Sequence, residues 1–308
     1  MMTKKIRLLF KGISIIGLIF FLAVGVSGCT ATRHTVQNTA VTLLDTSVDD
    51  LVDGIMRTNN GAFVKDGLPG ALLVITGLTE LAPTDYKLLS TTSFLYAAYA
   101  LFVEDGNEDY AISLYKVGTE YALRAMKVNN SKFRKALESG TPVYDAVKFL
   151  TKDDLKALTW YGVNLAKRVT LQLETPDVIM DVQDGIAAAK RGNEIDPKYS
   201  WGVNWAVLGV FYAIIPPVMA LGGGAETSRD AFANGNKAEN GEFGVMDVLQ
   251  ARYLAALIKD PEMYDRLNNR VLQMDPCKLG GGLCIVNELA KQKARYNLEY
   301  KCRYMDCP

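Results

Sequence analysis

Histidine is almost absent from this chain of 308 residues: the only one is His34. Without a histidine further along, the chain has no Ser-His-Asp or Cys-His nucleophile system and no zinc site with an imidazole ligand. Enzymes that use carboxylate pairs, Ser-Lys pairs or tyrosine remain open in principle. The sequence favours a non-enzymatic protein, and we expect no catalytic residue, no cofactor and no metal.

The N-terminal apolar run is too short to be a stable membrane span. Four basic residues precede an uncharged, mostly apolar stretch over 13–26, whereas a spanning helix needs about 20 residues. The stretch ends in Val26-Ser27-Gly28-Cys29, which resembles the lipobox of bacterial lipoproteins, where the cysteine is acylated and the chain is cut before it. An uncleaved anchor is the alternative. The small residues before Cys29 favour cleavage after residue 28 and lipidation of Cys29.

Excess positive charge is also missing. Removing residues 1–28 takes away four of the 34 basic residues and no acidic ones, so the remaining net charge is 30 − 34 = −4. No basic field is present to hold nucleic acid, and we expect no such partner. Residues 29–47 are polar and rich in threonine, which indicates a lipidated tether. The predicted location is the periplasmic side of the envelope. The residue after Cys29 is Thr30 rather than the aspartate that marks inner-membrane retention in some bacteria. This difference slightly favours the outer membrane.

Cysteine is confined to Cys29 and the end of the chain. The other four are Cys277, Cys284, Cys302 and Cys307. An even set in an exported protein favours disulfides. A metal site with four thiolates is the alternative, but C-x6-C and C-x4-C are not the short spacings that zinc usually takes. Three pairings are possible, and the sequence does not choose among them.

Strand patterns are missing as well, because no segment alternates Val, Ile and Thr between hairpin turns. Apolar residues recur instead at helical spacing, and no proline lies between residues 84 and 141. The predicted fold class is all-α. Helices are predicted over about 85–104, 107–128, 155–169, 246–256 and 264–274.

The helices end in a recurring way. A proline follows each of three amphipathic stretches: Pro83, Pro197 and Pro276. Proline ends a helix because it lacks an N–H and clashes with the preceding turn. These endings resemble the close of a tetratricopeptide helix pair. A strict 34-residue period is not visible, so we predict a degenerate tetratricopeptide-like helical repeat array. It spans 48–298, is interrupted by an insertion at 129–153, and is followed by a cysteine-containing tail at 299–308.

Aromatic side chains are the candidate ligand contacts. The best candidates are Trp160, Trp201, Tyr96 and Tyr99, as contacts to an apolar ligand or a pore. An aromatic stripe more often fills the core between helices, and this interpretation stays open beside the first. Trp160 and Trp201 are favoured because a glycine follows each closely.

Three other motifs have structural interpretations. The glycines at 222–224 follow two prolines and predict a turn rather than a phosphate loop, because no Gly-Lys-Ser/Thr follows them. The pair Asp153-Asp154 precedes an apolar helix and predicts an N-terminal cap. Lys291, Lys293 and Arg295 are expected on the solvated face of a terminal helix.

Several separated blocks in the same order resemble the T component of tetratricopeptide-associated tripartite (TRAP) transporters. The blocks are GLPGALLVITGLTELAPTD (67–85), FLYAAYALFVED (94–105), YALRAM (121–126), KDDLKALTWYGVNLAKRV (152–169), EIDPKYSWG (194–202), PPVMALGGGAETSRDAF (216–232) and NELAKQKARY (287–296). The resemblance runs from about residue 48 to 298. The tail lies outside it.

The resemblance implies a periplasmic lipoprotein with a helical repeat array that assembles as a homotrimer around a central channel. It also implies docking to a periplasmic substrate-binding protein, the P component of an importer. The implied ligand is small, either an organic acid or a hydrophobic molecule. The implied role is that of a non-catalytic adaptor and ligand conduit. An envelope scaffold that assembles membrane machinery through its repeats is the alternative.

Overall fold

The described part of the chain is helical. The computed structural model describes residues 48–175, 178–219, 221–279 and 284–307, and no strand occurs among them. The predicted signal peptide (1–28), the tether (29–47) and the lipidation site Cys29 lie outside the described residues. A helical segment at 51–56 precedes the main helices. These are α2 (Gly61–Leu81), α3 (Tyr86–Val103), α4 (Glu108–Asn129), α5 (Ser131–Glu138), α6 (Val143–Ala146), α7 (Leu155–Leu171), α8 (Val178–Ile195), α9 (Val203–Ile214), α10 (Ala225–Ala238), α11 (Gly244–Leu249), α12 (Pro261–Gln273) and α13 (Cys284–Glu299).

Helix ends follow local chemistry. Asp85 and Asn107 accept hydrogen bonds from the backbone N–H of Leu88 and Tyr110, which caps α3 and α4. α2, α8 and α12 end two or three residues before the three prolines that the sequence singled out. The all-α prediction is confirmed, and the five predicted ranges coincide with helical segments. The range 246–256 contains the end of α11 and a π-helical segment, Gln250–Ala255.

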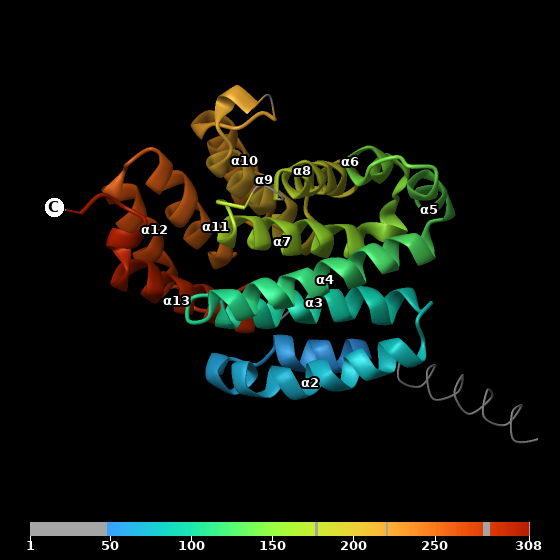
Figure 1. Cartoon of the computed structure of the whole chain (residues 1–308). Helices are drawn as coiled ribbons and strands as arrows, with labels where there is room; N and C mark the ends of the chain where they lie inside the picture. The colour runs from blue at the N-terminus through green and yellow to red at the C-terminus, as the bar shows by residue number, and fades with distance from the viewer. Residues whose placement is uncertain (1–47, 176–177, 220, 280–283, 308) are drawn as a thin grey trace, which may run out of the picture. The chain divides into compact units, whose positions relative to one another are not determined.

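Within residues 51–308, which form one compact unit, successive helices pack side by side. α3 packs on α2 and α4, α7 packs on α4 and α8, and α9 packs on α8 and α10 (Figure 1). α12 and α11 pack on α13, which in turn contacts α2. The array therefore returns on itself and brings the last long helix beside the first.

Two junctions between neighbouring helix pairs are built alike. Asn164 of α7 donates to Ser93 of α3 at 3.2 Å and lies against Gly118 of α4, where an added Cβ would fall 2.4 Å from the amide oxygen. Asn204 of α9 donates to a threonine of α7 at 3.2 Å and lies against a glycine of α8 in the same way. This recurrence agrees with a helix-pair array. The tetratricopeptide-like character of the repeats stays a prediction.

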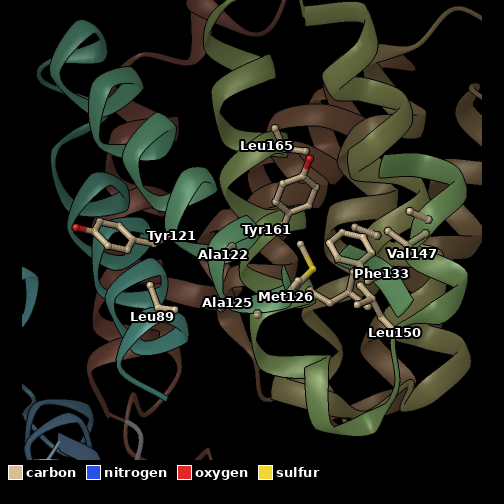
Figure 2. Close-up of a cluster of buried hydrophobic side chains, with 14 residues drawn as sticks. Leu89, Tyr121, Ala122, Ala125, Met126, Phe133, Val147, Leu150, Tyr161 and Leu165 are labelled. Atoms are coloured by element: carbon tan, nitrogen blue, oxygen red, sulfur yellow. The ribbon is translucent and has the colours of Figure 1, made fainter. Parts of the chain in front are cut away.

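The segment 129–153, predicted as an insertion, lies between α4 and α7 and holds the short helices α5 and α6. It is anchored by apolar side chains: Phe133 and Leu150 are fully buried with Met126 of α4 and Tyr161 of α7 (Figure 2). Asp154 accepts hydrogen bonds from the backbone N–H of Thr151 and from two asparagine side chains at the end of α4. The carboxylate predicted as a cap thus joins the segment to the start of α7.

Candidate functional site

A cavity of about 320 Å³ lies inside the array. Its wall is contributed by the segment 51–56, α3, α7, the turn 199–202, α9, α11, the π-helical segment and α13. None of the lining residues comes from α2, α4, α8, α10 or α12. Alternate helices of the described array therefore face the cavity, as in solenoids whose helix pairs curve around a concave surface.

Most of the wall is apolar. α7 contributes Trp160, Val163 and Ala166, and α9 contributes Val207 and Val210. α3 and α13 add the residues Phe94, Ala98, Leu101, Phe102, Ile285, Val286 and Leu289. A cavity of this size and composition suits a small molecule with an apolar body.

The two tryptophans favoured from the sequence both line this cavity. Trp160 packs against Phe94, with ring centroids 4.6 Å apart, and Trp201 packs against Phe243 at 6.1 Å. Trp201 lies in a turn where Ser200, Trp201 and Gly202 all have positive φ, of 47°, 57° and 74°. Such a backbone costs on the order of 1–3 kcal/mol for each non-glycine residue and persists only where its surroundings hold it. The packing of Trp201 against the wall provides that support.

The other two aromatic candidates lie away from the cavity. Tyr96 stacks on Tyr121 of α4 and shares a hydrogen bond with Thr76 of α2. Tyr99 is buried, with its ring edge-on to Tyr110 of α4. Both tyrosines therefore fill space between helices, which is the alternative that the sequence left open.

Part of the cavity wall is a buried cluster of charged residues, which we call the charged cluster. It comprises Glu104 and Asp105 at the end of α3, Lys167 of α7, Arg252 of the π-helical segment and Lys293 of α13. All of these except Asp105 line the cavity. Glu104 Oε1 lies 2.9 Å from Lys167 Nζ and 2.7 Å from Lys293 Nζ. Asp105 lies 2.7 Å from Lys293 and 3.1 Å from Arg252 Nη2.

Aromatic and amide groups surround the charged cluster. Tyr115 donates its hydroxyl proton to Glu104 Oε2 at 2.5 Å, and Arg252 Nε donates to Asn297 Oδ1 at 2.8 Å. The Arg252 guanidinium lies over the Tyr304 ring, 4.9 Å from its centroid. These contacts fix the orientation of the arginine, because a planar guanidinium can stack on a ring while its edge donates hydrogen bonds.

The charged cluster keeps Glu104 ionised. Burial alone would raise the pKa of Glu104, but Lys167, Lys293 and Arg252 together hold that pKa below its usual value. Burial raises the pKa of Tyr115, and the adjacent Glu104 carboxylate raises it further, so the phenol stays a donor. Burial lowers the pKa of Lys293, and the adjacent Glu104 and Asp105 carboxylates partly offset that shift.

Lys293 corrects one prediction from the sequence. We expected it on the solvated face of the terminal helix with Lys291 and Arg295, yet its side chain is only 7% exposed and pairs with two carboxylates. The reason is geometric: residues i and i+2 of a helix point to nearly opposite sides, so the three residues cannot share one face. Arg295 is exposed, as expected.

The four late cysteines pair locally. Cys277 is bonded to Cys284 and Cys302 to Cys307, across separations of seven and five residues. This pairing is one of the three that the sequence left open, and it leaves none of the four thiols free to hold a metal. The second bridge closes the tail just after α13, near Tyr304 and hence near Arg252.

The outer side of α2 is apolar and exposed. Val64, Leu68 and Leu72 are buried on the side of α2 that packs on α3, while Leu73 and Val74 on the other side are 78% and 64% exposed. Phe63 and Leu81 extend this apolar α2 face to both ends of the helix. In the described part of the chain, α2 alone has the length and hydropathy of a membrane span, a criterion that core helices and signal sequences also meet.

Residues 59–305 match the TRAP transporter T-component family, TAtT. The chain belongs to this family. The matched range begins just before α2 and includes all the residues that line the cavity except those of the segment 51–56. It extends past residue 298 and includes Cys302. A comparison with curated proteins gave no match.

Membership confirms the resemblance that the sequence blocks carried, and it gives the chain a role in TRAP transporters. It assigns no residue of the cavity. The charged cluster was not found from the sequence, although Glu104-Asp105 directly after an apolar helix and Lys167 on an otherwise apolar face were visible signals. Each looks ordinary alone, since their partners lie far along the chain.

Proposed function

We propose that this T component is a non-catalytic adaptor of a TRAP-type importer and that it binds an apolar small molecule in its internal cavity. The cavity carries this proposal, because an apolar wall inside an array of paired helices suits a ligand better than a flat scaffold surface does. The charged residues beside it form ion pairs with one another. Such paired charges give no sign of acid–base catalysis, and the family role agrees with this.

The proposal includes docking to the periplasmic substrate-binding protein of the same importer. A repeat array offers an extended surface for such a partner. Contacts must be transient, because a delivering partner has to leave. Micromolar affinity, about −8 kcal/mol, therefore fits better than nanomolar affinity, about −12 kcal/mol.

Self-association as a trimer belongs to the same proposal. The apolar α2 face supports it, because contiguous exposed apolar surface on a soluble unit marks an interaction site. Gly67, Gly70 and Gly77 lie on this face with nothing within 4 Å of an added Cβ, so a helix of another copy could approach closely.

The remaining parts of the proposal come from the sequence. The Val-Ser-Gly-Cys ending supports a lipid anchor at Cys29 on the periplasmic side of the envelope, with the outer membrane slightly favoured. Two or three acyl chains are needed for stable anchoring, because a single chain binds only marginally. A tether restricts the adaptor to the membrane layer and raises its effective concentration near the membrane subunits.

Sedimentation of residues 30–308, alone and mixed with the substrate-binding protein of the same importer, tests the proposal. We expect a trimer alone and added mass in the mixture. Replacing Leu73 with Glu should give monomers, whereas Leu173→Glu, at an exposed leucine outside α2, is the matched control and should stay a trimer. A monomer that does not associate with the binding protein at roughly 100 μM would defeat the proposal and favour the scaffold.

A further inference from the structure

The cavity wall has two chemically different parts. The body of the cavity lies between α3, α7, α9 and α13 and is lined by Val163, Val210, Phe243 and Leu289. The charged side chains of the charged cluster line another part, and Asp53 and Lys156 also line the cavity. A wholly apolar ligand would leave the charged part unmatched, and a small polar ligand would leave the body unmatched. Only a ligand with both characters matches the whole cavity.

The charges of the cluster do not cancel. Lys167, Arg252 and Lys293 are 6–8% exposed and face two carboxylates, Glu104 and Asp105, which are 2% and 10% exposed. With all five groups ionised the cluster sums to +3 − 2 = +1. Burial lowers the pKa of Lys293, and the neighbouring cations Arg252 and Lys167 lower it further, which reflects the cost of that excess charge. An excess buried positive charge costs free energy unless an anion accompanies it.

Arg252 has donors to spare. Its Nε is used by Asn297, but its buried Nη2 makes no hydrogen bond, although Asp105 Oδ1 lies 3.1 Å away. The side chain is 8% exposed and lines the cavity. It projects from the π-helical segment, a helix form that appears frequently at functional sites. A guanidinium edge with free N–H groups matches a carboxylate or another oxyanion.

We propose that the cavity binds an amphipathic monoanion, with its negative group at Arg252 and its apolar body along α7, α9 and α13. This inference rests on the proposed function, since it names the class of ligand that the adaptor carries. The amphipathic class excludes small polar di-acids, which have no apolar body to fill the valine-rich part of the cavity. It also excludes neutral apolar molecules, which leave the excess charge uncompensated.

Three probes of graded character test the proposal on residues 30–308. Decanoate has both an apolar chain and a negative charge. Decan-1-ol has a ten-carbon chain without the charge, and succinate has charge without an apolar body. Isothermal titration at constant ionic strength should give decanoate a Kd at least tenfold lower than that of decan-1-ol, and no measurable binding of succinate. Equal Kd values for decanoate and decan-1-ol would overturn the proposal and leave the charged cluster as a structural clasp between α3 and α13.

Two variants locate the anionic group. Arg252→Met should remove the preference for decanoate over decan-1-ol while leaving decan-1-ol binding unchanged. Asp105→Asn removes the carboxylate that competes for Arg252 and should tighten decanoate binding several-fold, which gives a positive result even if Arg252→Met does not fold. Arg124→Met, at a half-exposed arginine on α4 outside the cavity, is the matched control and should behave as wild type.

The outcomes separate this inference from the proposed function. An unchanged decanoate preference in Arg252→Met, or weaker decanoate binding by Asp105→Asn, would overturn the assignment to Arg252. Strongest binding of succinate would overturn the amphipathic class. If neither ten-carbon probe binds, the inference and the ligand-carrying part of the proposed function both fail. Docking to the substrate-binding protein is then still decided by sedimentation.

Discussion

Glu104 is the carboxylate on which the charged cluster depends. It is 2% exposed, accepts the Tyr115 hydroxyl, and lies within 2.9 Å of both Lys167 and Lys293. Glu104→Gln keeps the shape of the side chain but removes its charge, which leaves three buried cations facing Asp105 alone. Removing one partner of a buried ion pair costs about 3–5 kcal/mol, because the remaining charge is uncompensated.

Urea unfolding followed by far-ultraviolet circular dichroism measures this loss. We expect Glu104→Gln to lower the free energy of unfolding by about 3–5 kcal/mol, a large share of the 5–15 kcal/mol typical of a domain. The control is Glu80→Gln, where a 52% exposed carboxylate pairs with Arg124 and the expected loss is below about 1 kcal/mol. A loss below about 1 kcal/mol for Glu104→Gln as well would refute the reasoning.

The pH dependence of the same variant has a defined sign. The folded-state pKa of Glu104 lies below its usual 4.5, so its stabilising contribution is complete above that pH and is lost as the pH falls towards the folded-state value. Glu104→Gln has no such contribution. The stability difference between wild type and variant should therefore shrink on acidification below pH 4.5 and stay constant above it.

Three further predictions concern other parts of the chain. Burial raises the pKa of Asp184 from 3.8 to about 6, so wild-type stability should fall as the pH rises through that window, by up to about 3 kcal/mol, and Asp184→Asn should flatten the profile in urea titrations. Gly209→Ala should destabilise by about 1–3 kcal/mol, because its Cβ would lie 2.7 Å from the Phe232 ring, whereas Gly54→Ala, in open space in the helical segment before α2, should stabilise by about 0.5–1 kcal/mol; equal effects in thermal melts would contradict this. Cys29→Ser should abolish acyl labelling and cleavage at that bond, and normal labelling of the variant would refute lipidation there.

Much of the fold was predictable because helix ends depend on local signals. The prolines at 83, 197 and 276 and the capping side chains Asp85 and Asn107 act within a few residues of where they stand. The helical spacing of apolar residues then identified which segments are helices. Such signals need no knowledge of which helix packs on which.

The cavity and the charged cluster depend on contacts that are distant in sequence. Glu104 and Lys293 are separated by 189 positions, and only the return of α13 towards α2 brings them together. Single-sequence spacing carries no information on that return. Helical spacing separates Lys293 from Lys291 and Arg295, but it does not identify the carboxylates that Lys293 meets.

The aromatic candidates show the same limit on one helix. Phe94 and Phe102 of α3 face the cavity, whereas Tyr96 and Tyr99 face α4. The sequence indicated that the stripe lies between helices, but not which neighbour each side chain meets. Trp160 lies in the cavity wall because α7 packs with that side towards the cavity. Trp201 lies there because of the strained turn at 200–202.

The central claim is that the T component takes up an apolar molecule inside its helical array. Fluorescence titration of residues 30–308 with N-phenyl-1-naphthylamine, a neutral apolar dye that accepts energy from tryptophan, tests it directly because Trp160 and Trp201 line the cavity. Ala98→Phe should fill the cavity and weaken dye binding at least tenfold, while Ala62→Phe, on the exposed side of α2, should bind as wild type does. No saturable binding by the wild type, or equal binding by all three proteins, would contradict the claim.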